Sequence, residues 1–266
     1  MIASIVKLFV AVAVVLPLAV YFLQDRLIFQ PQRLDDAHRV EIAARYPAAK
    51  EIFITATDGT RLHAWYLESG PDLVLYFGGN AEEVSWMLGS AQAELPRASW
   101  LLTDYRGYGA SRGSPSEKSL VSDALLWHQY ATHELHAKHI FAFGRSLGSG
   151  VAVALAARRP LAGVILSTPY DSLAAVAQRY YPYLPVRWLL RHRFDSVALA
   201  PRLDAPLLCL IAGRDDVIPP VHAERLYAAW GGPKRKLVLA GALHNDTDAA
   251  PGFWPAIRRF VSVGSG

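Results

Sequence analysis

Short apolar segments alternate with longer segments of helical periodicity along most of the chain. The apolar segments are rich in Val, Ile, Leu and Phe, which is typical of strands in a sheet that is covered on both faces. We expect strands at Glu51–Ala56, Arg61–Leu67, Leu73–Phe77, Ser99–Thr103, His139–Phe143, Gly163–Ser167, Leu207–Ala212 and Lys236–Ala240. We expect helices at Glu82–Glu94, Ser116–His133, Leu147–Arg158, Val221–Trp230 and Phe253–Val261.

The order of these elements predicts the fold class. An Asp58-Gly59 turn between the first two strands is typical of an antiparallel hairpin, and the strand–helix–strand alternation after it implies right-handed parallel crossovers. We therefore expect an α/β fold, with a mostly parallel sheet of about eight strands that begins antiparallel and carries helices on both faces. Residues 25–266 contain no repeat or low-complexity linker, so they are expected to form one domain.

One connection, residues 169–206, is longer than an ordinary loop between a strand and its neighbour. It contains five aromatic residues, Tyr170, Tyr180, Tyr181, Tyr183 and Trp188, and two prolines that interrupt helices, Pro182 and Pro185. An insertion after a parallel strand overhangs the crevice in which such sheets bind ligands, so we predict a small cap. The alternative is a surface excursion whose aromatic side chains pack on the domain.

Residues 1–24 are strongly apolar, and Lys7 is the one charge between Ile2 and Leu23. This length approaches the roughly 20 residues that cross a bilayer, and the residues become bulkier toward Leu23 instead of smaller as before a cleavage site. We therefore predict an uncleaved single-pass signal anchor, with a cleaved signal peptide and a buried helix as alternatives. Lys7 opposes only Arg26 and Arg33, which leaves the side of the membrane undetermined.

Composition excludes several other classes of protein. The chain is 52% hydrophobic and 19% charged, and its 27 Lys+Arg against 23 Asp+Glu give a net charge of +4 without a basic cluster, so we expect no nucleic-acid partner. The single cysteine, Cys209, lies in an apolar segment and is expected to be buried. We predict no metal and no cofactor, because the histidines at 128, 133, 136 and 139 lack a ligand cage and no phosphate-binding loop is present.

The chemistry centres on a Gly-x-Ser-x-Gly pattern, Gly144 to Gly148, placed between a predicted strand and a predicted helix. Glycines at these spacings permit a sharp strand-to-helix turn that leaves the Ser146 hydroxyl exposed at the helix N-terminus. Such a serine needs a base and an acid that orients the base. His244 is expected to be the base, since it follows the last strand, whereas His222 lies within a helix.

The acid is expected to follow the strand Leu207–Ala212, where Asp215 and Asp216 are both available. Acyl transfer also requires donors for the oxyanion of the transition state. We expect one to be the backbone amide of Leu147, which follows the nucleophile, and the other to be Asn80, which follows the glycine pair after an early strand.

These motifs together resemble the α/β-hydrolase superfamily, and in particular its membrane-anchored serine hydrolase branch, which includes depalmitoylases. The resemblance is carried by the segments 75–81, 104–111, 144–148 and 217–219 and by His244, and it extends over nearly all of residues 25–262. It implies that Asp215 is the triad acid, since the branch has an Asp-x-Val-Ile-Pro pattern. Many relatives have His where this chain has Gly78.

The predicted function is a serine hydrolase that cleaves a carboxylic ester or thioester through an acyl-enzyme, with a small-molecule or lipid-like acyl substrate. Ser146, Asp215 and His244 would form the triad. The alternative is a non-catalytic, membrane-anchored binding protein on a hydrolase fold. Dehalogenase and epoxide hydrolase chemistry is excluded, because each needs a carboxylate at the position of Ser146.

Overall fold

The structure is a computed structural model that describes residue 15 and residues 17–264. Its strands are β1 (Ala49–Thr55), β2 (Arg61–Leu67), β3 (Asp72–Phe77), β4 (Ser99–Thr103), β5 (His139–Arg145), β6 (Gly163–Ser167), β7 (Leu207–Ala212) and β8 (Lys234–Leu239). Its helices are α2 (Asp36–Arg45), α3 (Met87–Glu94), α4 (Glu117–His133), α5 (Leu147–Ala156), α6 (Leu173–Tyr180), α7 (Val186–Leu189), α8 (Ser196–Leu199), α9 (Pro220–Ala229) and α10 (Phe253–Gly264). Short 3-10 turns are η1 (Val84–Trp86), η2 (Ala200–Arg202) and η3 (Thr247–Ala249).

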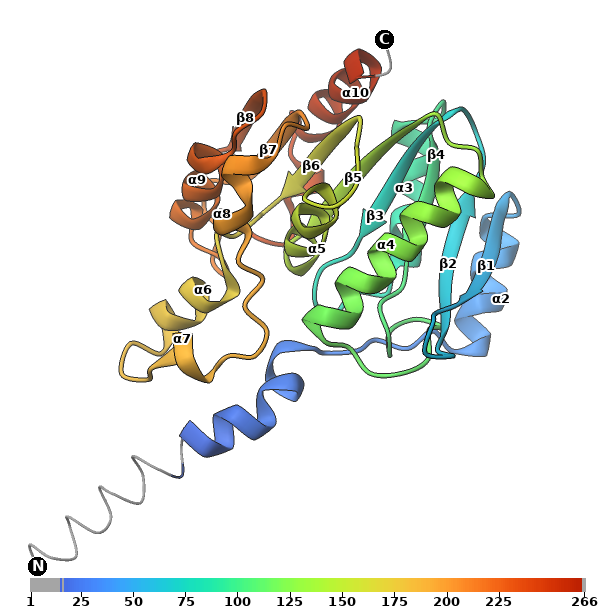
Figure 1. Ribbon diagram of the computed structural model, residues 1–266. Coiled ribbons are helices and arrows are strands. Elements are labelled where there is room, and N and C mark those ends of the chain that lie inside the picture. The colour runs from blue at the N-terminus through green and yellow to red at the C-terminus, as the bar shows by residue number, and fades with distance from the viewer. Residues whose placement is uncertain (1–14, 16, 265–266) are drawn as a thin grey trace, which may run out of the picture.

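The strands form one eight-stranded sheet in the order β1-β2-β4-β3-β5-β6-β7-β8. The β1–β2 and β2–β4 pairs are antiparallel, and the pairs from β4 through β8 are parallel. The predicted fold class is therefore confirmed, including the antiparallel beginning. Figure 1 shows the twisted sheet running across the molecule with helices on either side.

Helices cover both faces of the sheet, which explains why its central strands are apolar at every position. In β3, Leu73 and Leu75 pack in one core with α4 and α5. Val74 and Tyr76 point to the other face and pack in a second core with α3 and α10. The parallel strands end at one edge of this covered sheet, and the loops beyond that edge carry the site described below.

Two differences from the sequence prediction have local causes. The predicted helix Glu82–Glu94 begins instead as η1 followed by α3, because the Glu83 side chain accepts a hydrogen bond from the Ser85 amide and caps a new turn. The helix α2 was missed; its N-cap Asp35 accepts a hydrogen bond from the His38 amide at 2.7 Å. Neither difference changes the order of the strands.

The long connection, residues 169–206, contains α6, α7, α8 and η2. In Figure 1, α6 and α7 project from the carboxyl edge of the sheet and lie close to the N-terminal helical residues 17–28. Gln24 joins the two segments, because its side chain donates to the Leu189 carbonyl at 3.2 Å and accepts from the Arg191 amide at 2.7 Å. The domain boundary predicted after residue 24 therefore lies inside the N-terminal helical residues 17–28.

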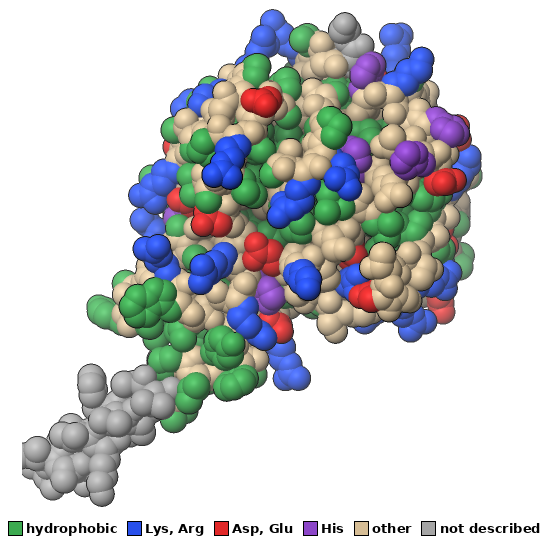
Figure 2. Space-filling view, in the orientation of Figure 1, with side chains coloured by type: hydrophobic (Ala, Val, Ile, Leu, Met, Phe, Trp, Pro, Cys, Tyr) green, Lys and Arg blue, Asp and Glu red, His purple; other side chains and the backbone are tan. Residues whose placement is uncertain are grey.

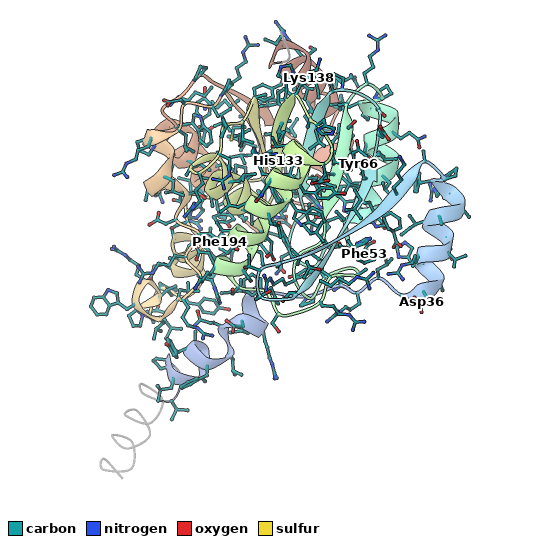
Figure 3. The ribbon with its side chains drawn as sticks, turned by 45° about the vertical axis from the view of Figure 1, so that its right-hand side comes forward. Asp36, Phe53, Tyr66, His133, Lys138 and Phe194 are labelled. Carbon is teal, nitrogen blue, oxygen red and sulfur yellow. The ribbon has the colours of Figure 1, made fainter. Side chains whose placement is uncertain are left out.

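Most of the predicted membrane anchor, residues 1–14 and residue 16, lies outside the described part of the chain. Within residue 15 and residues 17–264, no helix has the length and apolar character needed to span a bilayer. The same residues hold no group of three His, Cys, Asp or Glu side chains suited to a metal ion. His133 ends α4 on the outside of the molecule (Figure 3).

Candidate active site

Ser146 occupies the sharp turn between β5 and α5. Its φ angle is 49°, in the left-handed region that non-glycine residues avoid, and the flanking glycines make this turn possible. A Cβ atom on Gly144 would lie 2.3 Å from the Gly148 carbonyl oxygen, and a Cβ on Gly148 would lie 2.1 Å from the carbonyl oxygen of Phe77. The Gly-x-Ser-x-Gly pattern is therefore a steric requirement of this turn.

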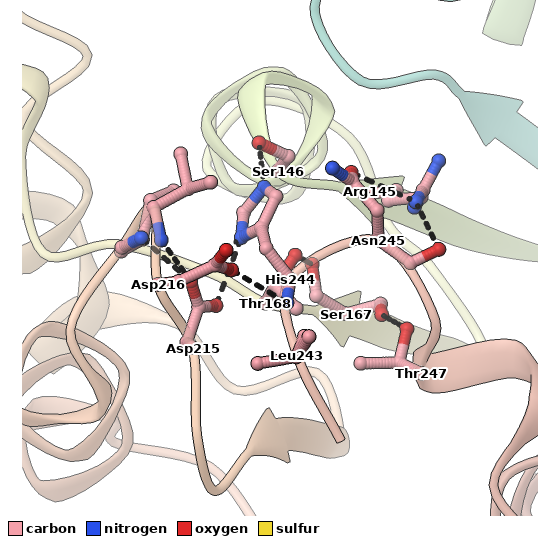
Figure 4. A network of polar contacts seen from close by, with 12 residues as sticks. Arg145, Ser146, Ser167, Thr168, Asp215, Asp216, Leu243, His244, Asn245 and Thr247 are labelled. Carbon is pink, nitrogen blue, oxygen red and sulfur yellow. Dashed lines mark hydrogen bonds and ion pairs between the residues drawn. The ribbon is translucent and has the colours of Figure 1, made fainter.

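The structure brings His244 to Ser146. The His244 Nε2 atom lies 2.9 Å from Ser146 Oγ, and Nδ1 lies 2.8 Å and 3.0 Å from the two carboxylate oxygens of Asp215 (Figure 4). When the Nδ1 proton faces Asp215, Nε2 is left as an acceptor for the Ser146 hydroxyl proton. Both the imidazole and the Asp215 side chain are buried, which strengthens their interaction.

The loop after β7 distinguishes between the two adjacent carboxylates. Asp215 turns inward, and its Oδ1 atom also accepts hydrogen bonds from the amides of Val217 at 2.9 Å and Ile218 at 2.6 Å. Asp216 is exposed, and its contact with His244 is to the backbone amide at 3.4 Å. Asp215, and not Asp216, therefore contacts the imidazole.

His222, the other candidate base, lies on α9 and is paired elsewhere. Its Nδ1 atom lies 2.8 Å from Asp171 Oδ1, and both side chains are almost completely buried. Of these two candidate bases, His244 is therefore the one that contacts Ser146.

The two candidate oxyanion donors flank Ser146. The Asn80 side-chain oxygen is already used, because it accepts hydrogen bonds from Tyr108 Oη at 2.8 Å and from the Gln30 amide at 2.9 Å. Among the described residues, the backbone amides of Asn80 and Leu147 have no acceptor. Both residues line the cavity above Ser146, so these two backbone amides are available to a ligand there.

Glu82 was missed by the sequence prediction, although it organises this side of the site. Its buried carboxylate accepts hydrogen bonds from Tyr76 Oη at 2.6 Å, Trp86 Nε1 at 2.7 Å, the Gly79 amide at 2.6 Å and Arg145 Nη1 at 3.1 Å. Burial, followed by the charge of Glu82, raises the pKa of Tyr76 well above its ordinary value, so the phenol stays a donor. The sequence feature that could have indicated this role is an acidic residue shortly after the Gly78-Gly79 pair.

A cavity of about 530 Å³ opens above Ser146, and we call it the apolar pocket. Its walls come from the N-terminal helical residues, from the residue 169–206 segment and from the loop after β7. The lining residues are Val20, Gln24, Leu27, Ile28, Asn80, Ser146, Leu147, Tyr170, Leu173, Val176, Ala177, Tyr180, Tyr181, Leu184, Val186, Leu189, Leu190, Asp216, Val217 and Ile218. Most of these side chains are aliphatic or aromatic, so the pocket suits a hydrophobic group adjacent to the hydroxyl of Ser146.

Comparison with known proteins identifies a family model and relatives that this chain resembles. Residues 73–197 match the family model of serine aminopeptidase, S33. The chain is 39% identical over 231 residues to protein Rv2307c of Mycobacterium tuberculosis, covering 81% of this chain and 80% of that protein. It is 26% identical over 268 residues to the alpha/beta hydrolase domain-containing protein WAV2 of Arabidopsis thaliana, covering 90% of this chain and 87% of that one.

Two solved esterases share the fold. The esterase Pf2001 of Pyrococcus furiosus has a TM-score of 0.69 at 17% identity, covering 89% of this chain and 97% of that chain. The esterase EaEST of Exiguobacterium antarcticum has a TM-score of 0.62 at 18% identity, covering 80% of this chain and 100% of that chain. The sheet order, the turn at Ser146 and the sequence relatives agree, and the chain therefore belongs to the α/β-hydrolase family.

Proposed function

We propose that the protein is a serine hydrolase that cleaves carboxylic esters or thioesters through an acyl-enzyme. The observation that carries this proposal is the line of contacts from Asp215 through His244 to the Ser146 hydroxyl. In the first step, Ser146 Oγ attacks the substrate carbonyl carbon while His244 Nε2 takes the hydroxyl proton. Asp215 orients the imidazole and stabilises the positive charge that develops on it.

The tetrahedral intermediate places a negative charge on the former carbonyl oxygen. We assign its stabilisation to the backbone amides of Asn80, in the loop after β3, and of Leu147, which follows Ser146; neither has an acceptor among the described residues. Collapse of the intermediate breaks the bond to the leaving group, which receives the proton from His244. Water then attacks the acyl-Ser146 carbonyl while His244 takes its proton; the bond between the acyl carbon and Ser146 Oγ breaks, His244 returns the proton to Oγ, and the carboxylic acid leaves.

The apolar pocket supports a lipophilic acyl group as the part of the substrate held beside Ser146. Of its polar lining residues, Gln24 is hydrogen-bonded to the backbone at Leu189 and Arg191, and the Asn80 side-chain oxygen accepts a hydrogen bond from Tyr108. Few side-chain groups are left to recognise a peptide backbone. This favours an ester or thioester with a hydrocarbon acyl chain over a peptide substrate.

We further propose that the apolar N-terminus holds the enzyme at a membrane. Support comes from exposed apolar side chains on the described part of this segment, Leu18, Phe22 and Leu23. The adjacent α6–α7 segment adds Tyr183, 97% exposed, and Trp188, 85% exposed, and aromatic residues of this kind are enriched at membrane interfaces. A lipophilic acyl substrate would be available there.

Covalent labelling with a fluorophosphonate probe, followed by peptide mapping, tests the proposed activity. We expect a single adduct on Ser146 that disappears in Ser146→Ala and in His244→Ala. Ser114→Ala, which removes an exposed serine in another loop, is the matched control and should label like the wild type. Absence of labelling in a folded wild-type sample, or equal labelling of the His244→Ala variant, would contradict the mechanism.

A second assay separates ester from peptide chemistry. p-Nitrophenyl esters and the p-nitroanilide of the same acyl group present the same acyl portion with different leaving groups. We expect turnover of the esters and little turnover of the anilide. Preferential turnover of the anilide would show that the activity is of the peptidase type.

A further inference from the structure

A second cavity, of about 560 Å³, lies on the other side of α6 from the apolar pocket. Val176 and Ala177 line the apolar pocket, whereas Ala175, Gln178 and Arg179 line the second cavity. The helix therefore separates two cavities with different linings. Figure 2, in the orientation of Figure 1, shows blue basic side chains next to the green hydrophobic surface where α6 and α7 project.

Four arginines line the second cavity, which we call the arginine cavity. They come from separate segments: Arg179 on α6, Arg187 on α7, Arg193 in the loop before α8 and Arg225 on α9. Asp195 is the one carboxylate in the lining. Within residues 17–264, neither Arg179 nor Arg187 forms an ion pair. The lining thus carries more positive than negative charge, and the described residues do not neutralise Arg179 and Arg187.

This arrangement favours an anion with several oxygens. A concave surface lined by charges of one sign raises the local concentration of the opposite ion. Arginine presents planar forks of N–H donors that match phosphate and carboxylate oxygens. Four such forks provide more donors than the two oxygens of a carboxylate can accept, whereas a phosphate monoester presents three terminal oxygens and up to two negative charges.

His222 contributes a buried polar atom that has no partner. Its Nδ1 atom lies 2.8 Å from Asp171 Oδ1, Nε2 has no hydrogen-bond partner among the described residues, and His222 is one of the residues that line the arginine cavity. Arg225 approaches the same Asp171 carboxylate, with Nη1 3.5 Å from Oδ2. Because this nitrogen is itself almost inaccessible, His222 forms part of the cavity wall, and the exposed arginines supply the donors that a ligand can reach.

We propose that the arginine cavity binds a phosphate group, carried either by a soluble phosphate ester or by a phospholipid headgroup. Arg179 and Arg187 would hold it from the residue 169–206 segment, and Arg225 would hold it from α9. A bound phosphate would therefore connect α6 and α7 to the body of the domain, directly behind one wall of the apolar pocket. This site does not depend on the proposed esterase activity.

Binding measurements on the full chain test the proposal. Isothermal titration calorimetry with inorganic phosphate and with glycerol 3-phosphate tests the soluble source. Co-sedimentation with phosphatidylcholine vesicles, with and without about one phosphatidic acid in five lipids, tests the headgroup. Arg179→Gln and Arg225→Gln each remove one exposed guanidinium from the cavity. Arg202→Gln removes an exposed guanidinium outside it and is the charge-matched control.

We expect binding to at least one probe, weakened about tenfold or more in Arg179→Gln and Arg225→Gln and unchanged in Arg202→Gln. Binding of glycerol 3-phosphate with this pattern identifies a soluble ester site. Binding of phosphatidic acid vesicles alone, with the same pattern, identifies a headgroup site. If no probe binds, or if the cavity variants behave like Arg202→Gln, the proposal is overturned. Hydrolysis of a short ester, measured in parallel, reports the proposed function separately.

Discussion

The Glu82 carboxylate accepts a hydrogen bond from the Gly79 amide at 2.6 Å, one residue before the proposed oxyanion donor Asn80. The same carboxylate contacts Arg145, which precedes Ser146 and the second proposed donor, Leu147. Glu82 therefore connects the two backbone segments that face the cavity. A buried carboxylate with all of its partners in place fixes such segments more firmly than a solvated one does.

Replacing this carboxylate tests its positioning role. We expect Glu82→Gln to fold and to lower kcat for a short ester by about 10- to 100-fold with little change in KM, since a displaced oxyanion donor weakens the transition state. Glu83→Gln is the control, because the Glu83 side chain contacts Ser85. Equal kcat values for the two variants would show that Glu82 is structural only.

Because the adjacent Asp215 and Asp216 have different contacts, we expect their isosteric asparagine variants to differ strongly in activity. Asp215→Asn removes the charge that orients His244 and should lower kcat by about 10⁴-fold. Asp216→Asn leaves the imidazole contact intact and should have a small effect, visible mainly in KM because Asp216 lines the apolar pocket. Steady-state kinetics on one p-nitrophenyl ester measures both. Similar losses in the two variants would refute this assignment of roles.

The sequence predicted those parts of the molecule that depend on local geometry. The turn around Ser146 follows from the clash that any side chain at Gly144 or Gly148 would cause, so its pattern is readable without a structure. The positions of the central strands could be expected because both faces of the sheet are buried, which makes strands such as Leu207–Ala212 continuously apolar.

Other parts depend on contacts between distant residues. The residues themselves left Asp215 and Asp216 open, and only the family resemblance implied Asp215, because the choice depends on the loop folding back so that the Val217 and Ile218 amides bind one carboxylate oxygen. The role of Glu82 depends on Arg145, 63 residues away. The number of residues between Glu82 and Arg145 does not reveal that their side chains are in contact.

The position of Ala177 predicts how acyl length is selected. Ala177→Trp would fill part of the apolar pocket, so we expect the ratio of kcat/KM for p-nitrophenyl octanoate to that for the acetate to fall by about tenfold or more. Ala175→Trp adds the same bulk on the opposite side of α6 and should leave the ratio unchanged. An unchanged ratio in Ala177→Trp would show that the acyl chain lies elsewhere.

Cys209 is predicted to be chemically silent in the folded protein. It is fully buried in β7, and burial raises the pKa of its thiol from 9.0 to about 12, so little thiolate is present and reagents have no access. Iodoacetamide at mildly alkaline pH should not modify the native chain but should modify it fully in urea. Mass spectrometry measures the adduct, and rapid modification of native protein would indicate local opening of β7.

Acid stability should depend on Asp58. The hydrogen bond from Arg106, followed by the Thr60 amide, lowers the pKa of Asp58 from 3.8 to about 2. A carboxylate whose pKa is depressed in the folded state stabilises that state above its unfolded pKa, and this contribution is lost as the pH falls from about 3.8 to about 2. The free energy of unfolding should therefore decrease over this interval.

Urea unfolding followed by circular dichroism measures this effect. The wild type should lose more stability between pH 5 and pH 2 than Asp58→Asn, in which no proton is taken up at this position. Asp36→Asn is the control, since that carboxylate is fully exposed and approaches Arg39 at 3.5 Å, so it should follow the wild type. Parallel stability curves for the wild type and Asp58→Asn would mean that Arg106 is held by Asp123 alone, the buried partner that it contacts at 2.8 Å through both Nε and Nη2.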